Sequence, residues 1–346
     1  MEWVPIFSYD DGQCFHREDD ERTRYWRQVH EVQWGDATNC SLTYTHKMIS
    51  SGWGADFDWL AWAMQSTFEA YRPFQVGFKT QDGRNHFWHY AAMKHTGLNV
   101  TCPSRDMFCY FYPLSKCQPG TVKESVEDDG ITDRHSQPQN LWLKQYLTRP
   151  QQWLRKAIYD YLRDETPQVP TPCIAMHVRR ADVVLHDEHS RKYFQIKDYL
   201  RKIGADANVR ELVRDGNNIL LFTDDANAID EAHTFHPNYN WVYLNRTRHR
   251  GSSGGWENQV PSQDPRKEVI MLLSILEMAK KCDAFAYTSS NYANVIRDTM
   301  LSTGRSIRLI RVDEGLEIHN SNHSLSEAEL AQKLMVDQQR SSTGVS

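Results

Sequence analysis

Three short polar segments in the second half of the sequence combine residue types that bind anions. Each segment follows a run of apolar residues. In chain order they contain His177, Arg179, Arg180 and Asp182; Thr223, Asp224 and Asp225; and Ser289, Ser290 and Asn291. A guanidinium offers paired N–H donors to two phosphate oxygens and keeps its charge, and hydroxyls with backbone N–H groups at the start of a helix also bind anions. The three segments predict a diphosphate pocket in which His177 hydrogen-bonds a base or a sugar.

Each segment also has an ordinary structural interpretation. Adjacent arginines are often a solvated pair, and both Thr-Asp-Asp and Ser-Ser-Asn are common helix caps. His177, between Met176 and Val178, has the setting of a core histidine. The joint occurrence of all three segments favours a ligand site, because ligands of doubly wound sheets bind beyond the carboxyl ends of the strands.

The elements that must position these segments alternate between strands and helices. Apolar runs predict strands over 173–178, 218–222, 241–244, 283–287 and 307–312. Between them, helices are predicted over 196–203, 227–235, 265–281 and 291–300. Parallel neighbours need crossover connections, so this alternation predicts an α/β fold with a mainly parallel sheet.

The first half of the chain has a different pattern. Apolar residues at helical spacing predict a helix from Phe57 to Tyr71, and Arg72-Pro73 ends it. A small-residue turn, Ser51–Asp56, precedes this helix. A strand over 74–78 and helices over 141–147 and 151–162 follow.

Length and proline content predict the domain organisation. A chain of 346 residues exceeds one ordinary core. Three prolines, at 167, 170 and 172, indicate a boundary. We therefore expect domains over 1–166 and 167–316, and a terminal helix with a disordered tail over 317–346.

Composition and short motifs exclude several classes of protein. The formal charge of −5 argues against a nucleic-acid binder, and the longest apolar run, near Val269–Leu273, is too short to span a bilayer. Residues Met1–Ile6 lack the regions of a signal peptide. The sequence contains no Cys-x-x-Cys spacing, which is the pattern typical of a zinc site. Four Asn-x-Ser/Thr glycosylation sequons begin at Asn39, Asn99, Asn245 and Asn322. About two would be expected by chance, so their number favours a secretory lumen. Any membrane anchor is then expected outside this chain.

The three polar segments resemble those of a known superfamily, the GDP-fucose-dependent α1,6-, α1,2- and protein O-fucosyltransferases. Ile174–Asp182 resembles its His-x-Arg-Arg-x-Asp motif. Leu220–Asp225 and Tyr287–Asn291 are similar to the second and third motifs of the α1,6 (core) branch, and Phe111–Cys117 resembles a stretch of that branch's first domain. The resemblance runs from about residue 40 to residue 313.

The resemblance implies a GT-B glycosyltransferase with two facing α/β domains. The first domain would serve the acceptor and the second would bind GDP-fucose. The reaction would invert the anomeric carbon, need no metal ion or other cofactor, and place fucose on a glycan or glycoprotein. The N-glycan core is the favoured acceptor, and the Golgi lumen the expected compartment.

The resemblance also implies roles for individual residues. His177 would contact guanine and Arg179 the β-phosphate. The remaining donor-binding residues would be Arg180, Asp224, Asp225, Ser289, Ser290 and Asn291, with Gly52 and Gly54 approaching from the first domain. Asp182, Asp224 and Asp225 match acids needed for activity, which would order the strand ends. Asp187, beside Glu188, occupies the place of the general base; an exposed loop acid is the alternative. Disulfides Cys40–Cys117 and Cys102–Cys109 are implied as well.

Two departures from the family pattern keep other functions open. Val183 stands where the core branch has a lysine, and Ile275 where an acid is thought to hold guanine, with Glu277 two positions on. The alternatives are a catalytically silent sugar-nucleotide or glycan-binding module and a protein O-fucosyltransferase. The segment 246–266 is either a lid or a basic surface loop.

Overall fold

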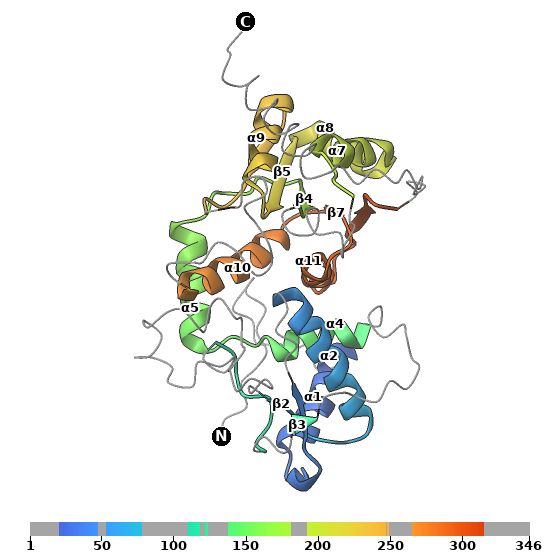
Figure 1. Cartoon of the computed structure of the whole chain (residues 1–346), viewed down its shortest axis with the longest axis vertical. Helices are drawn as coiled ribbons and strands as arrows, with labels where there is room; N and C mark the ends of the chain where they lie inside the picture. The colour runs from blue at the N-terminus through green and yellow to red at the C-terminus, as the bar shows by residue number, and fades with distance from the viewer. Residues whose placement is uncertain are drawn as a thin grey trace, which may run out of the picture. The chain divides into compact units, whose positions relative to one another are not determined.

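The computed structural model describes residues 21–47, 53–77, 110–117, 122–123, 138–180, 192–246, 248 and 265–314 (Figure 1). The chain divides into two compact units. The first comprises Met1–Thr166, Ser262–Glu277 and Asn294–Gly304, and the second Pro167–Pro261, Met278–Ala293 and Arg305–Ser346. Among the described residues, no helix is long and apolar enough to cross a membrane.

The second unit is built on a five-stranded sheet in which every neighbouring pair is parallel, with the order β6-β5-β4-β7-β8. The strands are β4 (Cys173–Val178), β5 (Asn218–Thr223), β6 (Asn240–Val242), β7 (Ala284–Tyr287) and β8 (Arg308–Arg311). All five predicted strands are present, which confirms the predicted α/β class and parallel sheet. β6 is displaced from its predicted range, because Tyr243 and Leu244 already follow the strand.

Helices α7 (Ile196–Ala205), α8 (Ala207–Gly216) and α9 (Ala226–Phe235) cover one face of this sheet, which we call the back face. Ile174, Met176 and Val178 of β4 point to it and join a core that includes Tyr199 of α7. Side chains alternate along a strand, so Cys173, Ala175 and His177 point to the opposite, front face. All six side chains of β4 are buried, as is typical of a central parallel strand.

The chain order of the strands creates a switch point in this sheet. From β4 the chain moves outward to β5 and β6, then returns to place β7 on the other side of β4. Doubly wound sheets bind ligands at the carboxyl ends of the strands where the order reverses in this way. The switch point lies between β4 and β7, which are followed by the first and third polar segments.

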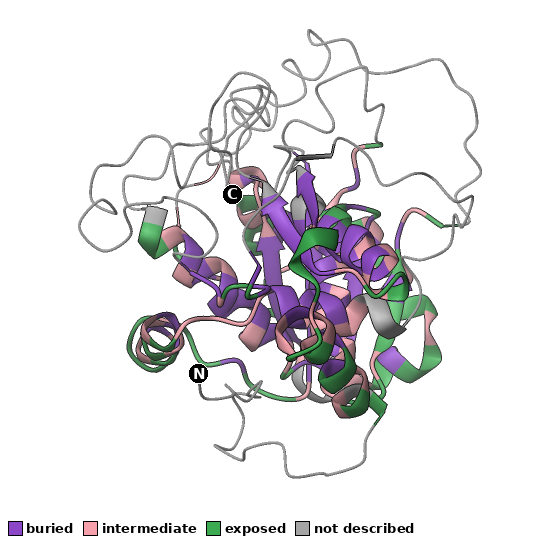
Figure 2. Cartoon of the chain, turned by 90° about the horizontal axis from the view of Figure 1, so that it is seen from below, coloured by how far each residue is buried: buried purple, intermediate pink, exposed green. Residues whose placement is uncertain are grey.

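The first unit contains a smaller parallel sheet with the order β2-β1-β3. Its strands are β1 (Tyr44–Lys47), β2 (Phe74–Gly77) and β3 (Val122–Lys123). The helical elements are α1 (Glu21–Trp34), η1 (Cys40–Leu42), α2 (Trp53–Glu69), α4 (Pro138–Leu147) and α5 (Gln152–Asp164), while α10 (Pro265–Ala279) and α11 (Asn291–Leu301) each contribute residues to both units. Figure 2 shows buried strands and helices whose outward faces are exposed.

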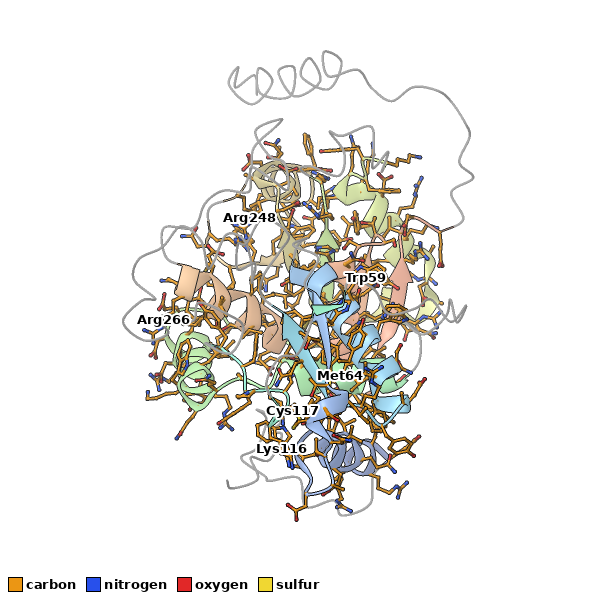
Figure 3. The ribbon with its side chains drawn as sticks, turned by 60° about the horizontal axis from the view of Figure 1, so that its bottom comes forward. Trp59, Met64, Lys116, Cys117, Arg248 and Arg266 are labelled. Carbon is orange, nitrogen blue, oxygen red and sulfur yellow. A yellow bond between two sulfur atoms is a disulfide. The ribbon has the colours of Figure 1, made fainter. Side chains whose placement is uncertain are left out.

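The start of α2 corrects one expectation. The helix begins at Trp53, four residues before the predicted start at Phe57, so Gly54 lies in its first turn and not in a preceding loop. The predicted apolar stripe is buried from Phe57 to Met64, which is labelled in Figure 3. Its predicted end is wrong, because the helix stops at Glu69 and Tyr71 is 81% exposed.

Two disulfides tie distant parts of the described chain. Cys40–Cys117, expected from the family resemblance, is confirmed. Cys173–Cys282 was not expected; it joins the first residue of β4 to the segment before β7, across a sequence separation of 109. Cys102 and Cys109 lie outside the described residues.

Candidate functional site at the carboxyl edge of the second sheet

Register places the first two polar segments side by side. Val178 of β4 lies opposite Thr223 of β5, so Arg179 and Arg180 follow one strand where Asp224 and Asp225 follow its neighbour. The alternation of side chains then sorts these four residues into two pairs. Arg179 and Asp224 continue the front face, and Arg180 and Asp225 continue the back face.

The front pair, Arg179 and Asp224, forms an ion pair between Nη1 and Oδ2. Both side chains are partly accessible, at 21% and 24% exposure. The second carboxylate oxygen of Asp224 accepts a hydrogen bond from the backbone N–H of Arg180 at 3.1 Å. Asp224 therefore fixes the Arg179 guanidinium against the strand end while leaving it within reach of solvent.

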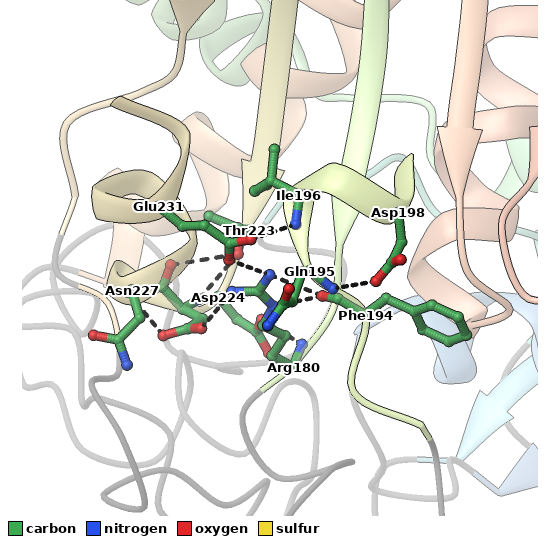
Figure 4. A network of polar contacts seen from close by, with 10 residues as sticks. Arg180, Phe194, Gln195, Ile196, Asp198, Thr223, Asp224, Asn227 and Glu231 are labelled. Carbon is green, nitrogen blue, oxygen red and sulfur yellow. Dashed lines mark hydrogen bonds and ion pairs between the residues drawn. The ribbon is translucent and has the colours of Figure 1, made fainter. Parts of the chain in front are cut away.

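The back pair belongs to a buried network around Arg180, whose side chain is 2% exposed (Figure 4). Its Nε and Nη2 donate to the carbonyl of Phe194 at 3.0 and 2.8 Å. Nη2 also pairs with Glu231 at 2.7 Å, and Nη1 with Asp225 at 3.4 Å. Burial opposes the charge of Arg180, but Tyr193, Glu231 and Asp225 outweigh it and raise the pKa. The structure thus turns the two adjacent arginines to opposite faces.

Asp225 has two tasks within this network. Its Oδ1 accepts the backbone N–H of Asn227 at 2.9 Å, as the N-cap of α9. Its own N–H donates to Thr223 Oγ1 at 3.1 Å. The helix-cap interpretation of Thr-Asp-Asp is therefore confirmed for Asp225, and the contact with Arg180 is additional to it.

The third polar segment forms the start of α11. Ser290 Oγ accepts the N–H of Ala293 at 3.0 Å and so caps the helix. Ser289 and Asn291 are exposed. The N–H of Ser289 donates to Asp313 Oδ2 at 3.2 Å, a carboxylate after β8 that sequence analysis did not select. The turn therefore places the exposed Ser289 at a helix N-terminus beside the switch point, while Ser290 is itself buried.

His177 lies on the front face of β4, opposite Tyr287 of β7. It is 4% exposed, and its ring meets that of Tyr292 edge-on, with 5.6 Å between the centroids. Burial raises the pKa of Tyr292, and Arg246 partly offsets this. The histidine is thus held between β4 and the first turn of α11.

Arg248, labelled in Figure 3, joins the strand end of β5 to the segment after β6. Its Nε donates to the carbonyl of Thr223 at 3.2 Å and its Nη2 to that of Leu244 at 2.7 Å. No pattern in the sequence distinguishes it from the other basic residues of the 246–266 segment.

Of the remaining predicted residues, the structure describes Gly54, Ile275 and Glu277, all in the first unit. Gly54 is buried in α2 of the first unit. Ile275 is 7% exposed within α10, which also carries Glu277. Gly52, Asp182, Val183, Asp187 and Glu188 lie outside the described residues. Within the described ranges, no three His, Cys, Asp or Glu side chains are grouped as metal ligands would be.

The fold and this edge define an α/β protein whose second unit presents a guanidinium and a helix N-terminus on either side of a sheet switch point. Both groups stabilise negative charge. Residues 69–249, more than half of the chain, match the family model described as alpha-(1,6)-fucosyltransferase N- and catalytic domains. The chain belongs to this family and is a fucosyltransferase by class.

The chain also resembles several solved structures at low identity. The chain is similar to a mutant of Arabidopsis thaliana FUT1 in complex with GDP, at 11% identity and a TM-score of 0.44, covering 83% of this chain and 78% of that one. It is similar to the α-1,6-fucosyltransferase NodZ soaked with GDP-fucose, at 11% and 0.39, covering 74% and 92%. A third is apo POFUT1, at 10% and 0.37, covering 80% and 99%.

Proposed function

We propose that this protein transfers fucose from GDP-fucose to a hydroxyl group of a glycan or glycoprotein, with inversion at the anomeric carbon and without a metal ion. The N-glycan core is the favoured acceptor. One observation supports this proposal above all. A fixed, partly accessible Arg179 and the capped start of α11 follow the two strands that flank one switch point.

The chemistry needs positive potential where charge develops. Loss of GDP builds negative charge on the leaving diphosphate, and a guanidinium fixed at the β-phosphate stabilises the transition state more than the ground state. Asp224 supplies that fixation. Ser289, Ser290 and Asn291 would bind the diphosphate from the other side of the switch point, and His177 would contact guanine.

The other roles remain proposals that rest on the family. Asp187 would deprotonate the acceptor hydroxyl, with Glu188 as its neighbour, and Asp182 would order the strand end. Gly52 and Gly54 would approach the donor from an acceptor-side domain, residues 1–166, facing a donor domain over 167–316 in a GT-B arrangement.

We propose the Golgi lumen as the compartment. Cys40–Cys117 and Cys173–Cys282 support an oxidising environment, since disulfides form and persist there.

A catalytically silent module that binds sugar nucleotide or glycan is the second candidate. Ile275 favours it, because this buried apolar side chain in α10 offers guanine no carboxylate. Protein O-fucosylation is the alternative within enzymes.

Titration calorimetry with GDP-fucose tests the donor site directly. We expect binding by the wild type and a loss of about 10- to 100-fold in Arg179→Ala, the range for a charge-assisted contact. Arg201→Ala, at an exposed position of α7, is the matched control. Equal affinity in Arg179→Ala would remove the donor-site assignment.

Turnover separates the enzyme from the silent module. Release of GDP is measured with N-glycan, oligosaccharide and protein acceptors, with and without chelator. Acceptor-dependent release that persists in chelator and disappears in Asp187→Ala supports the transferase; binding without release with any acceptor supports the silent module.

A further inference from the structure

The two carboxylate oxygens of Glu231, on α9, contact two different segments of the chain (Figure 4). Oε2 pairs with Arg180 Nη2 at 2.7 Å. Oε1 accepts the backbone N–H of Ile196, the first residue of α7, also at 2.7 Å. The Glu231 side chain is only 16% exposed, so both contacts are largely shielded from water.

The same carboxylate closes a ring of contacts around the end of β4. Arg180 donates from its guanidinium to the carbonyl of Phe194, two residues before Ile196. Glu231 therefore holds Arg180 and the start of α7 together at one point. The other acid on this guanidinium, Asp225, is at a longer 3.4 Å and is also engaged as a helix cap.

The ring is linked to the front face through the main chain of Arg180. While its side chain points to the back face, its backbone N–H donates to Asp224, and Asp224 pairs with Arg179. A shift of Arg180 would thus move Arg179, the residue directly before it. The same shift would weaken the hydrogen bond that holds Asp224, the acid paired with Arg179. These contacts connect the Arg179 guanidinium to groups on the opposite face of the sheet.

We propose that Glu231 is a positioning residue for Arg179 and so for recognition of the donor's terminal phosphate. This inference rests on the proposed function, in which Arg179 faces the β-phosphate. Glu231 itself does not touch the donor; it acts through Arg180 and Asp224. The neutral variant Glu231→Gln keeps an acceptor for Ile196 and removes the charge paired with Arg180.

Calorimetry with GDP and with GMP compares the loss of affinity for the two nucleotides. A merely structural role of Glu231 would change both affinities alike. We expect Glu231→Gln to weaken GDP binding about tenfold and to leave GMP binding within about twofold, because GMP lacks the phosphate that Arg179 would contact. Glu211→Gln, an exposed acid of α8, is the matched control and should bind both nucleotides as the wild type does.

A double-mutant cycle completes the test, since coupled residues are non-additive. In the Arg179→Ala background, Glu231→Gln should cost GDP affinity little more. If Glu231→Gln does not fold, Glu231→Asp keeps the charge but cannot reach both partners, and an intermediate, GDP-selective loss is expected. Equal losses for GDP and GMP, an unchanged GDP affinity, or additive effects would overturn the proposal. Failure of Arg179→Ala alone to weaken GDP binding would instead remove the donor site itself.

Discussion

His46 of β1 makes the stability of the first unit depend on pH. Its ring is 5% exposed and lies near the rings of Tyr44 and Phe74, with centroids 6.3 and 6.4 Å away. In the described part of the chain neither ring nitrogen has a hydrogen-bond partner. Burial lowers the pKa of His46 from 6.5 to about 4.

The direction of the effect follows from linkage. Between pH 6.5 and 4 the unfolded chain binds a proton at His46 and the folded chain does not. The free energy of unfolding therefore falls as the pH falls, by about 1.4 kcal/mol per unit. The contribution of His46 is complete above pH 6.5, declines by about 2 kcal/mol between pH 7 and 5, and declines by about 3 kcal/mol in total near pH 4.

His46→Leu isolates this contribution. Leucine fills a similar volume and leaves no polar nitrogen unpaired, so we expect the variant to be at least as stable as the wild type at pH 7. Urea unfolding of both proteins at pH 7, 6 and 5 gives the difference in unfolding free energy. That difference should shift in favour of the variant by about 2 kcal/mol from pH 7 to 5. Parallel pH profiles for the two proteins would refute the reasoning.

Three further predictions concern buried contacts. Lys144→Met should cost about 3–5 kcal/mol of unfolding free energy in urea, because Lys144 is buried between Asp58 and Asp298; Asp58→Asn should restore part of it, and a cost below about 1 kcal/mol contradicts the prediction. Replacing Cys173 and Cys282 by serine should lower the free energy of unfolding by about 2–5 kcal/mol relative to the oxidised wild type, with the reduced wild type as a control; equal stability of oxidised wild type and variant contradicts it. Ser290→Ala should cost about 1 kcal/mol through the lost cap of α11 and weaken GDP binding in calorimetry; unchanged affinity would limit the serine to a structural role.

The sequence predicts the second sheet well because its central strands, β4, β5 and β7, are buried on both faces. β4, β5 and β7 are short apolar runs, and each is bounded by polar residues that end it. Such runs are typical of central parallel strands. Helices are predicted between these strands as well, except α8, although its Val209, Leu212 and Val213 have the i, i+3, i+4 spacing of an amphipathic helix.

The first sheet is much less visible in the sequence. β1 reads Tyr-Thr-His-Lys, with polar side chains at three of its four positions, and it has neither an apolar run nor an alternating pattern. Thr45 and His46 are nevertheless buried, because β2 and β3 pair with β1 on both sides. Tertiary context overrides β-propensity here.

The candidate site was predicted as a set of residues but not as a set of contacts. Glu231 is 51 residues from Arg180, and Cys282 is 109 from Cys173. No local spacing links either pair. Asp313 is close to Ser289 because β8 pairs with β7, and this contact becomes visible only in the folded chain.

The two adjacent arginines show how a strand end can combine support and chemistry. Period-two alternation requires successive residues to point to opposite faces, and two aspartates in matching register follow the neighbouring strand. On the back face, Arg180 meets a carbonyl and two acids at once, which a planar guanidinium can do and a lysine ammonium does poorly. On the front face, Arg179 pairs with Asp224 and stays partly exposed. The buried arginine fixes the backbone on which the accessible one stands, so the pair works as a support and a charged group that no single basic residue could provide.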